Sequence, residues 1–160
     1  MIPPKVREVL ERNNLRAIEF PPGSTPTAVL AAQKLGVAVG NIAKSLLFIA
    51  KDGRYFMVVC PGDRKIANSK LKAATGVKTR MADAAQTLQA TGFPPGGVCP
   101  FGVEGIEILL DAALAGFETI YPAAGTDSSG VPMSFEQLRR ITAGRVCDCT
   151  VDQAGGQAGS

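Results

Sequence analysis

The stretch AKSLLFIAKDGRYFMVVC, residues 43–60, carries a strong signal of local structure. Two apolar runs rich in β-forming residues, 43–50 and 54–60, flank the short polar segment Lys51-Asp52-Gly53. An Asp-Gly pair between two such runs favours a tight turn that brings the second run back alongside the first. The sequence therefore predicts a β-hairpin here.

Helices and strands are intermixed on both sides of this hairpin. The apolar spacing, with prolines at the starts and glycines at the ends, predicts helices at 5–12, from Ser24 or Thr25 to Leu35, at 66–74, at 82–90 and at 135–141. Expected helix-end signals are Gly36, Gly76, Gly92 and, as an N-cap, Ser134. Further strands are expected at 17–20, 118–123, 131–133 and 145–151, and the run 106–110 is apolar.

The order of these elements indicates the fold class. Because strands and helices do not alternate regularly, we expect an α+β fold in which helices flank a curved, mixed and mostly antiparallel sheet. A length of 160 residues, with 46% hydrophobic and 19% charged residues, is typical of one globular domain. We expect this domain to span residues 1–152 and the segment QAGGQAGS, 153–160, to form a flexible tail.

The composition also bears on compartment and partners. No apolar run approaches the roughly 20 residues that cross a bilayer, and the N-terminal segment MIPPKVREVLERNN lacks the basic start and apolar core of a signal peptide. We therefore expect a cytoplasmic protein with no membrane contact. The net charge of +3 permits an anionic partner, but two tyrosines and no tryptophan argue against an aromatic platform for single-stranded bases. Contact with one end of a nucleic acid stays open.

Cysteine and histidine usage excludes several kinds of chemistry. The chain has four cysteines and no histidine, so we expect reduced thiols and no metal site. The spacing of Cys147 and Cys149 would place both thiols on one face of a strand, a poor geometry for a disulfide. A nucleophile activated by histidine is excluded, and a thiol-transfer role for Cys99 or for Cys147 and Cys149 lacks both a base and a CxxC motif.

The segment TGFPPGGVCPFG, residues 91–102, contains four glycines and three prolines. Such a loop is stiff at its prolines and exposes backbone N–H groups at its glycines. It is either a surface turn or a concave surface rich in hydrogen-bond donors.

Two charged residues next to apolar runs have similar alternatives. Lys44 is either a strand-end lysine that extends its ammonium into water or a cation at the mouth of a pocket. Asp111 is either the cap of a short helix at 112–115 or a carboxylate that orients Lys44 or a substrate amine. The polar segment 125–130 reads as a turn and lacks the lysine of a phosphate-binding P-loop.

Taken in order, several segments resemble the YbaK/EbsC family of free-standing aminoacyl-tRNA deacylases, which are relatives of the editing domain of bacterial prolyl-tRNA synthetases. The resemblance covers about residues 27–151. It is carried by TAVLAAQKLG and IAKSLLF, by RYFMVVCPGD, by TGFPPGGVCPFG, by ILLDAALAGFETIY with AAGT, and by EQLRRITAGRVCDCTVD.

The resemblance implies hydrolysis of the ester between a wrong amino acid and its tRNA, typically tRNA for proline, without a cofactor or a protein nucleophile. It implies that Lys44 is the residue most closely tied to activity and that the backbone of the loop around Gly97 lines the aminoacyl pocket. These two are the catalytic candidates. Expected substrate-binding residues are Ser45, Gly96, Val98, Cys99, Pro100, Asp111 and Gly125.

The implied partners are the 3′ end of an aminoacyl-tRNA and, as a candidate, prolyl-tRNA synthetase. Many relatives carry serine or proline at the position of Cys99, so the amino acid that is removed stays open. A second hypothesis is a non-catalytic module that binds a tRNA end or a protein. The presence of both Lys44 and the 96–100 loop favours the enzyme.

Overall fold

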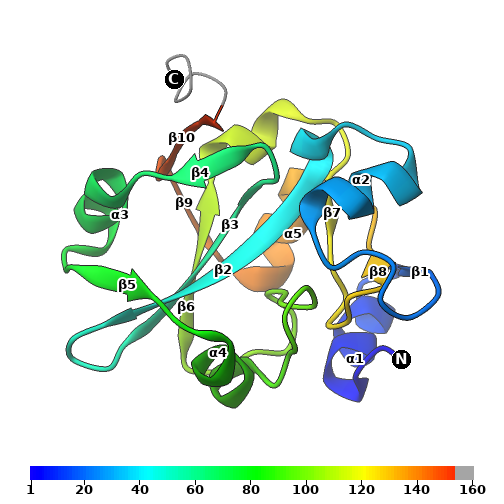
Figure 1. The fold of residues 1–160 in the computed structure, drawn as a ribbon, viewed down its shortest axis with the longest axis horizontal. Coiled ribbons are helices and arrows are strands. Elements are labelled where there is room, and N and C mark those ends of the chain that lie inside the picture. The colour runs from blue at the N-terminus through cyan, green and yellow to red at the C-terminus, as the bar shows by residue number, and fades with distance from the viewer. Residues whose placement is uncertain (154–160) are drawn as a thin grey trace.

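The computed structural model describes residues 1–153, so the predicted tail, apart from Gln153, lies outside the described residues. Figure 1 shows helices placed around a central sheet. The helices are α1 (Pro4–Arg12), α2 (Ala28–Leu35), α3 (Asn68–Thr75), α4 (Ala84–Thr91) and α5 (Phe135–Thr142), with the 3-10 helices η1 (Val39–Asn41) and η2 (Ala112–Gly116). The strands are β1 (Ile18–Glu19), β2 (Ile42–Ala50), β3 (Tyr55–Pro61), β4 (Arg64–Ile66), β5 (Thr79–Met81), β6 (Ile106–Asp111), β7 (Tyr121–Pro122), β8 (Ser129–Gly130), β9 (Arg145–Cys147) and β10 (Thr150–Asp152).

The predicted hairpin is formed by β2 and β3. The two strands pair antiparallel, with Lys44 opposite Cys60 and Ile49 opposite Tyr55. Its turn is closed by hydrogen bonds from Gly53 N to Ala50 O and from Ala50 N to Arg54 O, both 2.9 Å long. The Asp-Gly signal therefore marked the turn correctly.

The hairpin lies inside a six-stranded mixed sheet with the order β5-β2-β3-β6-β9, in which β7 also pairs with β2. Pairings β2–β3 and β2–β5 are antiparallel, whereas β2–β7, β3–β6 and β6–β9 are parallel. Two smaller antiparallel pairs, β1–β8 and β4–β10, complete the strand pairing of residues 1–153. The α+β class and the mixed sheet are confirmed. Antiparallel pairing dominates only when the two small pairs are included.

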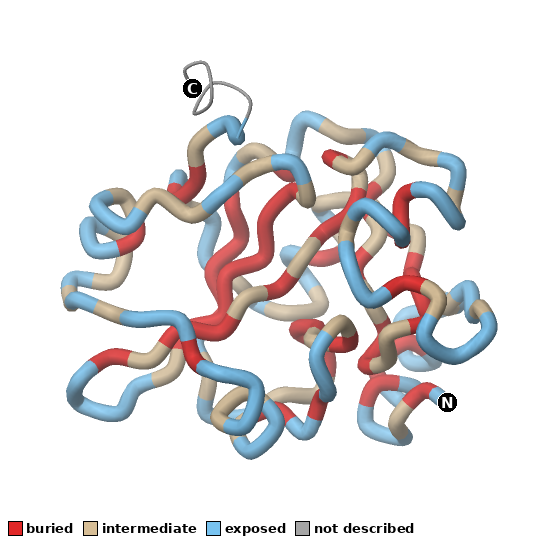
Figure 2. Tube along the Cα trace, viewed as in Figure 1, coloured by how far each residue is buried: buried red, intermediate tan, exposed pale blue. Residues whose placement is uncertain are grey.

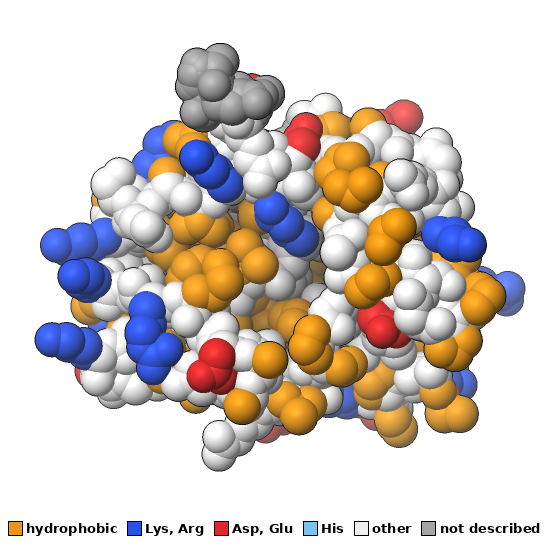
Figure 3. Space-filling view, in the orientation of Figure 1, with side chains coloured by type: hydrophobic (Ala, Val, Ile, Leu, Met, Phe, Trp, Pro, Cys, Tyr) orange, Lys and Arg blue, Asp and Glu red, His pale blue; other side chains and the backbone are white. Residues whose placement is uncertain are grey.

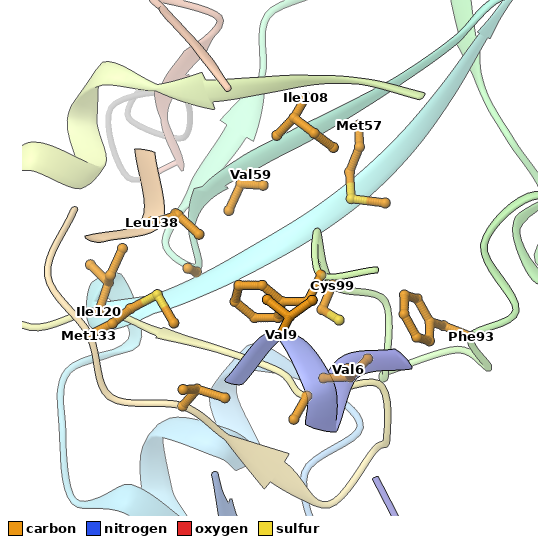
Figure 4. Close-up of a cluster of buried hydrophobic side chains, with 14 of the residues drawn as sticks. Val6, Val9, Met57, Val59, Phe93, Cys99, Ile108, Ile120, Met133 and Leu138 are labelled. Atoms are coloured by element: carbon orange, nitrogen blue, oxygen red, sulfur yellow. The ribbon is translucent and has the colours of Figure 1, made fainter. Parts of the chain in front are cut away.

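The central strands are buried on both faces (Figure 2). On one face, Met57 and Val59 of β3 pack with residues of α1 and with Leu138 of α5 (Figure 4). On the other face, Phe56, Val58 and Cys60 join a second cluster that includes Leu71 of α3. A strand buried on both faces reads as a continuous apolar run, which explains the sequence YFMVVC.

Several predicted boundaries were wrong for identifiable reasons. The cap of α2 is Thr27, whose Oγ1 accepts a hydrogen bond from Leu30 N, and not Ser24 or Thr25. Residue Ile66 belongs to β4, where it pairs with Thr150, so α3 begins later than expected. The strand expected at 145–151 is two strands, because β9 pairs with β6 whereas β10 pairs with β4. The helix-ending glycines Gly36, Gly76 and Gly92 and the Ser134 cap are confirmed.

Candidate active site

The edge of β2 opposite β3 is left open in its middle. Strand β7 pairs with β2 only at Ile42 and Ala43, and β5 pairs with it only from Phe48 to Ala50. Hydrogen bonds from Ala50 N to Arg54 O and from Gly62 N to Ile42 O show that even-numbered β2 residues direct their backbone groups toward β3. Odd-numbered residues therefore direct theirs toward the open edge, and Leu47 O does accept a hydrogen bond from Ala82 N there. The backbone of Ser45 faces the gap between β7 and β5.

Three loops meet at this gap. Thr25 N and Thr25 Oγ1 both donate to Asp127 O, at 2.7 and 2.9 Å, which ties the loop before α2 to the loop before β8. The third loop is the segment 91–102, which we call the glycine loop, and at its tip lies Gly96, which has a φ of 82°. A Cβ added at Gly96 would lie 2.9 Å from Pro26 Cα and 3.2 Å from Asp127 Cβ. Only glycine therefore fits where the three loops converge.

The loops and the β2 edge enclose a cavity of about 240 Å³, which we call the main cavity. Lys44 lines it and is half-buried. No hydrogen bond or ion pair within residues 1–153 involves the Lys44 ammonium, so its charge is available to a ligand. The other residues that line the main cavity are Thr25, Pro26, Thr27, Ala28, Ala31, Leu35, Ile42, Ala43, Ser45, Leu46, Gly96, Val98, Tyr121, Ala123 and Ser129.

The glycine loop presents two backbone donors. Gly97 N donates to Pro94 O at 3.0 Å, so this N–H is occupied within the loop. The N–H groups of Gly96 and Val98, on either side of it, have no hydrogen-bond partner among the described residues. Both residues line the main cavity. The donor-rich surface that the sequence indicated is present, but its available donors flank Gly97.

Gly97 itself is constrained by space. It is buried, and its φ is not in the left-handed region. A Cβ at this position would lie 2.8 Å from Thr126 N and 2.9 Å from Gly125 O. Gly125 is thus placed beneath the loop as a packing partner, outside the lining of the main cavity.

The glycine loop is supported from below by α1, an interaction that no sequence motif indicated. Lys5 Nζ donates to Thr91 O at the start of the loop and lies 4.4 Å from the centre of the Phe93 ring. A Cβ on Gly102, at the other end of the loop, would lie 3.0 Å from Lys5 Cγ. One lysine therefore contacts both ends of the segment 91–102.

Cys99 and Pro100 do not line the main cavity. Cys99 is fully buried in the cluster between α1 and the sheet, close to Phe93 and Val6 (Figure 4). Burial raises the pKa of its thiol to about 12, so this thiol is protonated at neutral pH. Pro100 lines a separate depression next to Val9 and Ile141. Cys99 and Pro100 point away from the main cavity because of the conformation of the loop, which its amino-acid composition does not specify.

Asp111 is also outside the main cavity. Its carboxylate is 1% exposed and accepts hydrogen bonds from Ala113 N at 3.2 Å, Cys149 N at 3.0 Å and Thr150 Oγ1 at 2.8 Å. The cap hypothesis is confirmed, because Asp111 is the N-cap of η2. The carboxylate also joins η2 to Cys149 and to Thr150, the first residue of β10.

The Sγ atoms of Cys147 and Cys149 lie 3.8 Å apart, and both thiols are free. Their hydrogen bond lowers the pKa of Cys147 and raises that of Cys149. Residues 1–153 contain no group of three histidine, cysteine or acidic residues arranged to hold a metal ion. Among the described helices, none has the length and apolar character needed to span a bilayer.

Comparison with known proteins gives a consistent result. Residues 22–141 match a family described as the aminoacyl-tRNA editing domain. The uncharacterised protein YwhH of Bacillus subtilis is 36% identical over 124 residues, which are 77% of this chain and 79% of that protein. A proline–tRNA ligase of Thermosipho melanesiensis is 35% identical over 111 residues, which are 69% of this chain but only 18% of the ligase.

A solved structure described as a proposed trans-editing enzyme for prolyl-tRNA synthetase superposes with a TM-score of 0.84. It is 30% identical, and the match covers 94% of this chain and 99% of that one. A second, described only as a hypothetical protein, has a TM-score of 0.86 at 28% identity and covers 92% of this chain. The fold extends over nearly the whole of both.

Proposed function

Because the chain belongs to the aminoacyl-tRNA editing domain family, we propose that it hydrolyses the ester linking a small, incorrect amino acid to tRNA. The observation that supports this best is the main cavity itself. It is lined by the ammonium of Lys44, which has no hydrogen-bond or ion-pair partner among residues 1–153, and by the two backbone donors at Gly96 and Val98. The likeness to proline–tRNA ligases favours tRNA for proline as the substrate.

The reaction we propose is attack of water on the ester carbonyl carbon. A bond forms between the water oxygen and this carbon, and the bond from this carbon to the ribose oxygen breaks. One water proton ends on the ribose oxygen, which becomes a hydroxyl, and the water oxygen stays in the carboxyl group of the released amino acid. The carbonyl oxygen gains negative charge in the transition state, and the N–H groups of Gly96 and Val98 are the donors available to it. Each well-placed donor of this kind contributes roughly 3 kcal/mol.

Lys44 supplies the positive charge in this scheme. Its ammonium binds the terminal phosphate or the ribose and so holds the ester against the loop, which lowers the entropic cost of reaching the transition state. Figure 3 shows further lysine and arginine side chains over α3 and β5. Lys72, Lys78 and Arg80 are exposed there and suit the phosphates of a tRNA acceptor stem.

The described residues 1–153 offer no activated nucleophile that could replace the attacking water. It contains no histidine, and the thiol of Cys99 is buried outside the cavity with its pKa raised to about 12. A neutral thiol away from the substrate does not attack an ester. Attack by water is therefore the mechanism that fits these residues.

The test is single-turnover deacylation of tRNA for proline charged with alanine, cysteine or serine, with correctly charged prolyl-tRNA as the control. We expect one or more mischarged forms to be hydrolysed and prolyl-tRNA to survive. Binding of the same tRNAs without any hydrolysis would instead favour the non-catalytic module. Repeating the assay with prolyl-tRNA synthetase added tests the proposed partnership, which predicts faster deacylation.

A further inference from the structure

The side chain of Ser45 is buried without a hydrogen-bond partner. Ser45 is 9% exposed, and its Oγ is the buried side-chain polar atom that lacks a partner among residues 1–153. Buried hydroxyl groups are nearly always hydrogen-bonded, because leaving one unpaired is unfavourable. A hydroxyl held in this state inside a cavity is positioned to pair with a bound ligand.

Ser45 stands between two adjoining cavities. It lines the main cavity and also a second one of about 200 Å³, which we call the side cavity. The two cavities share Leu46, Gly96 and Val98 as well. A ligand bound against the glycine loop therefore lies next to the side cavity, and Ser45 is among the residues that line both cavities.

The side cavity is otherwise apolar in its side chains. Its hydroxyl groups belong to Ser45 and Thr87, and Thr87 Oγ1 already donates to Asp83 O at 2.8 Å. Its remaining lining residues are Leu46, Leu47, Met81, Ala82, Ala84, Pro95, Gly96 and Val98. A small ligand group with one polar atom matches this lining, provided that atom reaches Ser45.

Resting on the proposed function, we propose that Ser45 determines specificity by hydrogen bonding to the side chain of the aminoacyl group, and that the preferred substrates carry a side-chain hydroxyl, as in seryl- and threonyl-tRNA. A hydroxyl both donates and accepts, so it pairs with the Ser45 hydroxyl in either direction. Alanyl and prolyl groups have no side-chain partner for Ser45 and leave it unpaired. Sites built to bond a hydroxyl discriminate strongly against analogues that lack one.

The experiment compares single-turnover deacylation of seryl-, threonyl- and alanyl-tRNA for proline by the wild-type protein, Ser45→Ala and Thr87→Val. We expect the wild type to prefer the two hydroxylated substrates at least tenfold over alanyl-tRNA. Ser45→Ala should slow hydrolysis of the hydroxylated substrates at least tenfold and change that of alanyl-tRNA less than threefold. Thr87→Val, which removes a hydroxyl that is already bonded in the same cavity, should keep the wild-type preference.

The outcomes separate the two proposals. Hydrolysis of none of the three substrates by the wild type would overturn this inference, and it would overturn the proposed function as well if cysteinyl-tRNA for proline also survives. Hydrolysis by the wild type with no preference for hydroxylated substrates, or equal effects of Ser45→Ala on all three, would overturn the role of Ser45 alone. Thermal unfolding of each variant shows that a rate change does not come from loss of the fold.

Discussion

Gly97 of the glycine loop and Gly125 lie so close together that there is no room for a side chain at position 97. A Cβ on Gly97 would lie 2.9 Å from both the carbonyl carbon and the carbonyl oxygen of Gly125. The loop that carries the two available backbone donors is therefore packed directly on the 125–130 segment. Catalytic geometry in this scheme depends on a contact between two backbones.

We expect Gly97→Ala to lower deacylation at least a hundredfold. The added Cβ must push the loop away from Gly125 and so displace the N–H groups of Gly96 and Val98. Overpacking of this kind also costs about 1–3 kcal/mol of stability, which chemical denaturation measures. Gly116→Ala is the matched control, because a Cβ at Gly116 meets no atom within 4 Å. Wild-type activity in a folded Gly97→Ala protein would place the ester elsewhere.

Lys44→Ala should remove most deacylation and leave the fold intact. A charge-assisted contact to phosphate contributes roughly 2–3 kcal/mol, so we expect a loss of about 30- to 150-fold in single-turnover rate. Thermal unfolding should change little, because no hydrogen bond or ion pair of the described residues involves this ammonium. Lys34→Ala, an exposed lysine of α2, is the control. Near-normal turnover by folded Lys44→Ala would contradict the assignment.

Cys99→Ser should keep deacylation within about tenfold of the wild type. The thiol lies in the core and its pKa is raised to about 12, so it does not serve as a nucleophile. Mass spectrometry of the protein quenched during turnover should find no acyl group on Cys99. A trapped thioester, or complete loss of activity in a folded Cys99→Ser protein, would contradict attack by water.

Two of the three buried thiols, those of Cys60 and Cys99, predict a pH dependence of stability. Burial raises the pKa of both Cys60 and Cys99 from 9.0 to about 12. Below pH 9 both thiols are protonated in the folded and unfolded states. Between pH 9 and 12 only the unfolded chain ionises, so the free energy of unfolding falls by up to about 1.4 kcal/mol per pH unit for each thiol. Urea unfolding at pH 8 to 10.5 should show a shallower fall in Cys60→Ala/Cys99→Ala, and an equal slope would contradict the buried state.

Lys5→Met should reduce both stability and activity. The methionine keeps an apolar chain near Phe93 but loses the hydrogen bond to Thr91 O and the cation–π contact. Together these contribute about 1–2 kcal/mol to the free energy of unfolding, and deacylation should fall because the glycine loop is less firmly held. The control is Lys51→Met at the exposed hairpin turn. Equal stability of the two variants would show that Lys5 does not support the loop.

Patterns within short segments of the chain were enough to predict its local elements and the kind of chemistry open to it. The Asp-Gly turn of the hairpin, the helix-ending glycines and the Ser134 cap depend on residues close in the chain, so their patterns were readable. The absence of histidine excluded the usual activated nucleophiles, and Lys44 and the 91–102 loop were recognised as unusual from their neighbours alone.

Which of these residues share a site depends on tertiary contacts. Whether Lys44 faces a cavity depends on β7 and β5 leaving the middle of the β2 edge unpaired. Cys99 and Asp111 have side chains that could serve in an active site. Packing instead directs Cys99 into the core, and Asp111 accepts a hydrogen bond from Thr150. Whether the Ser45 hydroxyl finds a hydrogen-bond partner depends on which distant segments of the chain pack next to it. Local sequence encodes backbone preferences, whereas burial and pairing arise from contacts between distant residues, and those contacts define the site.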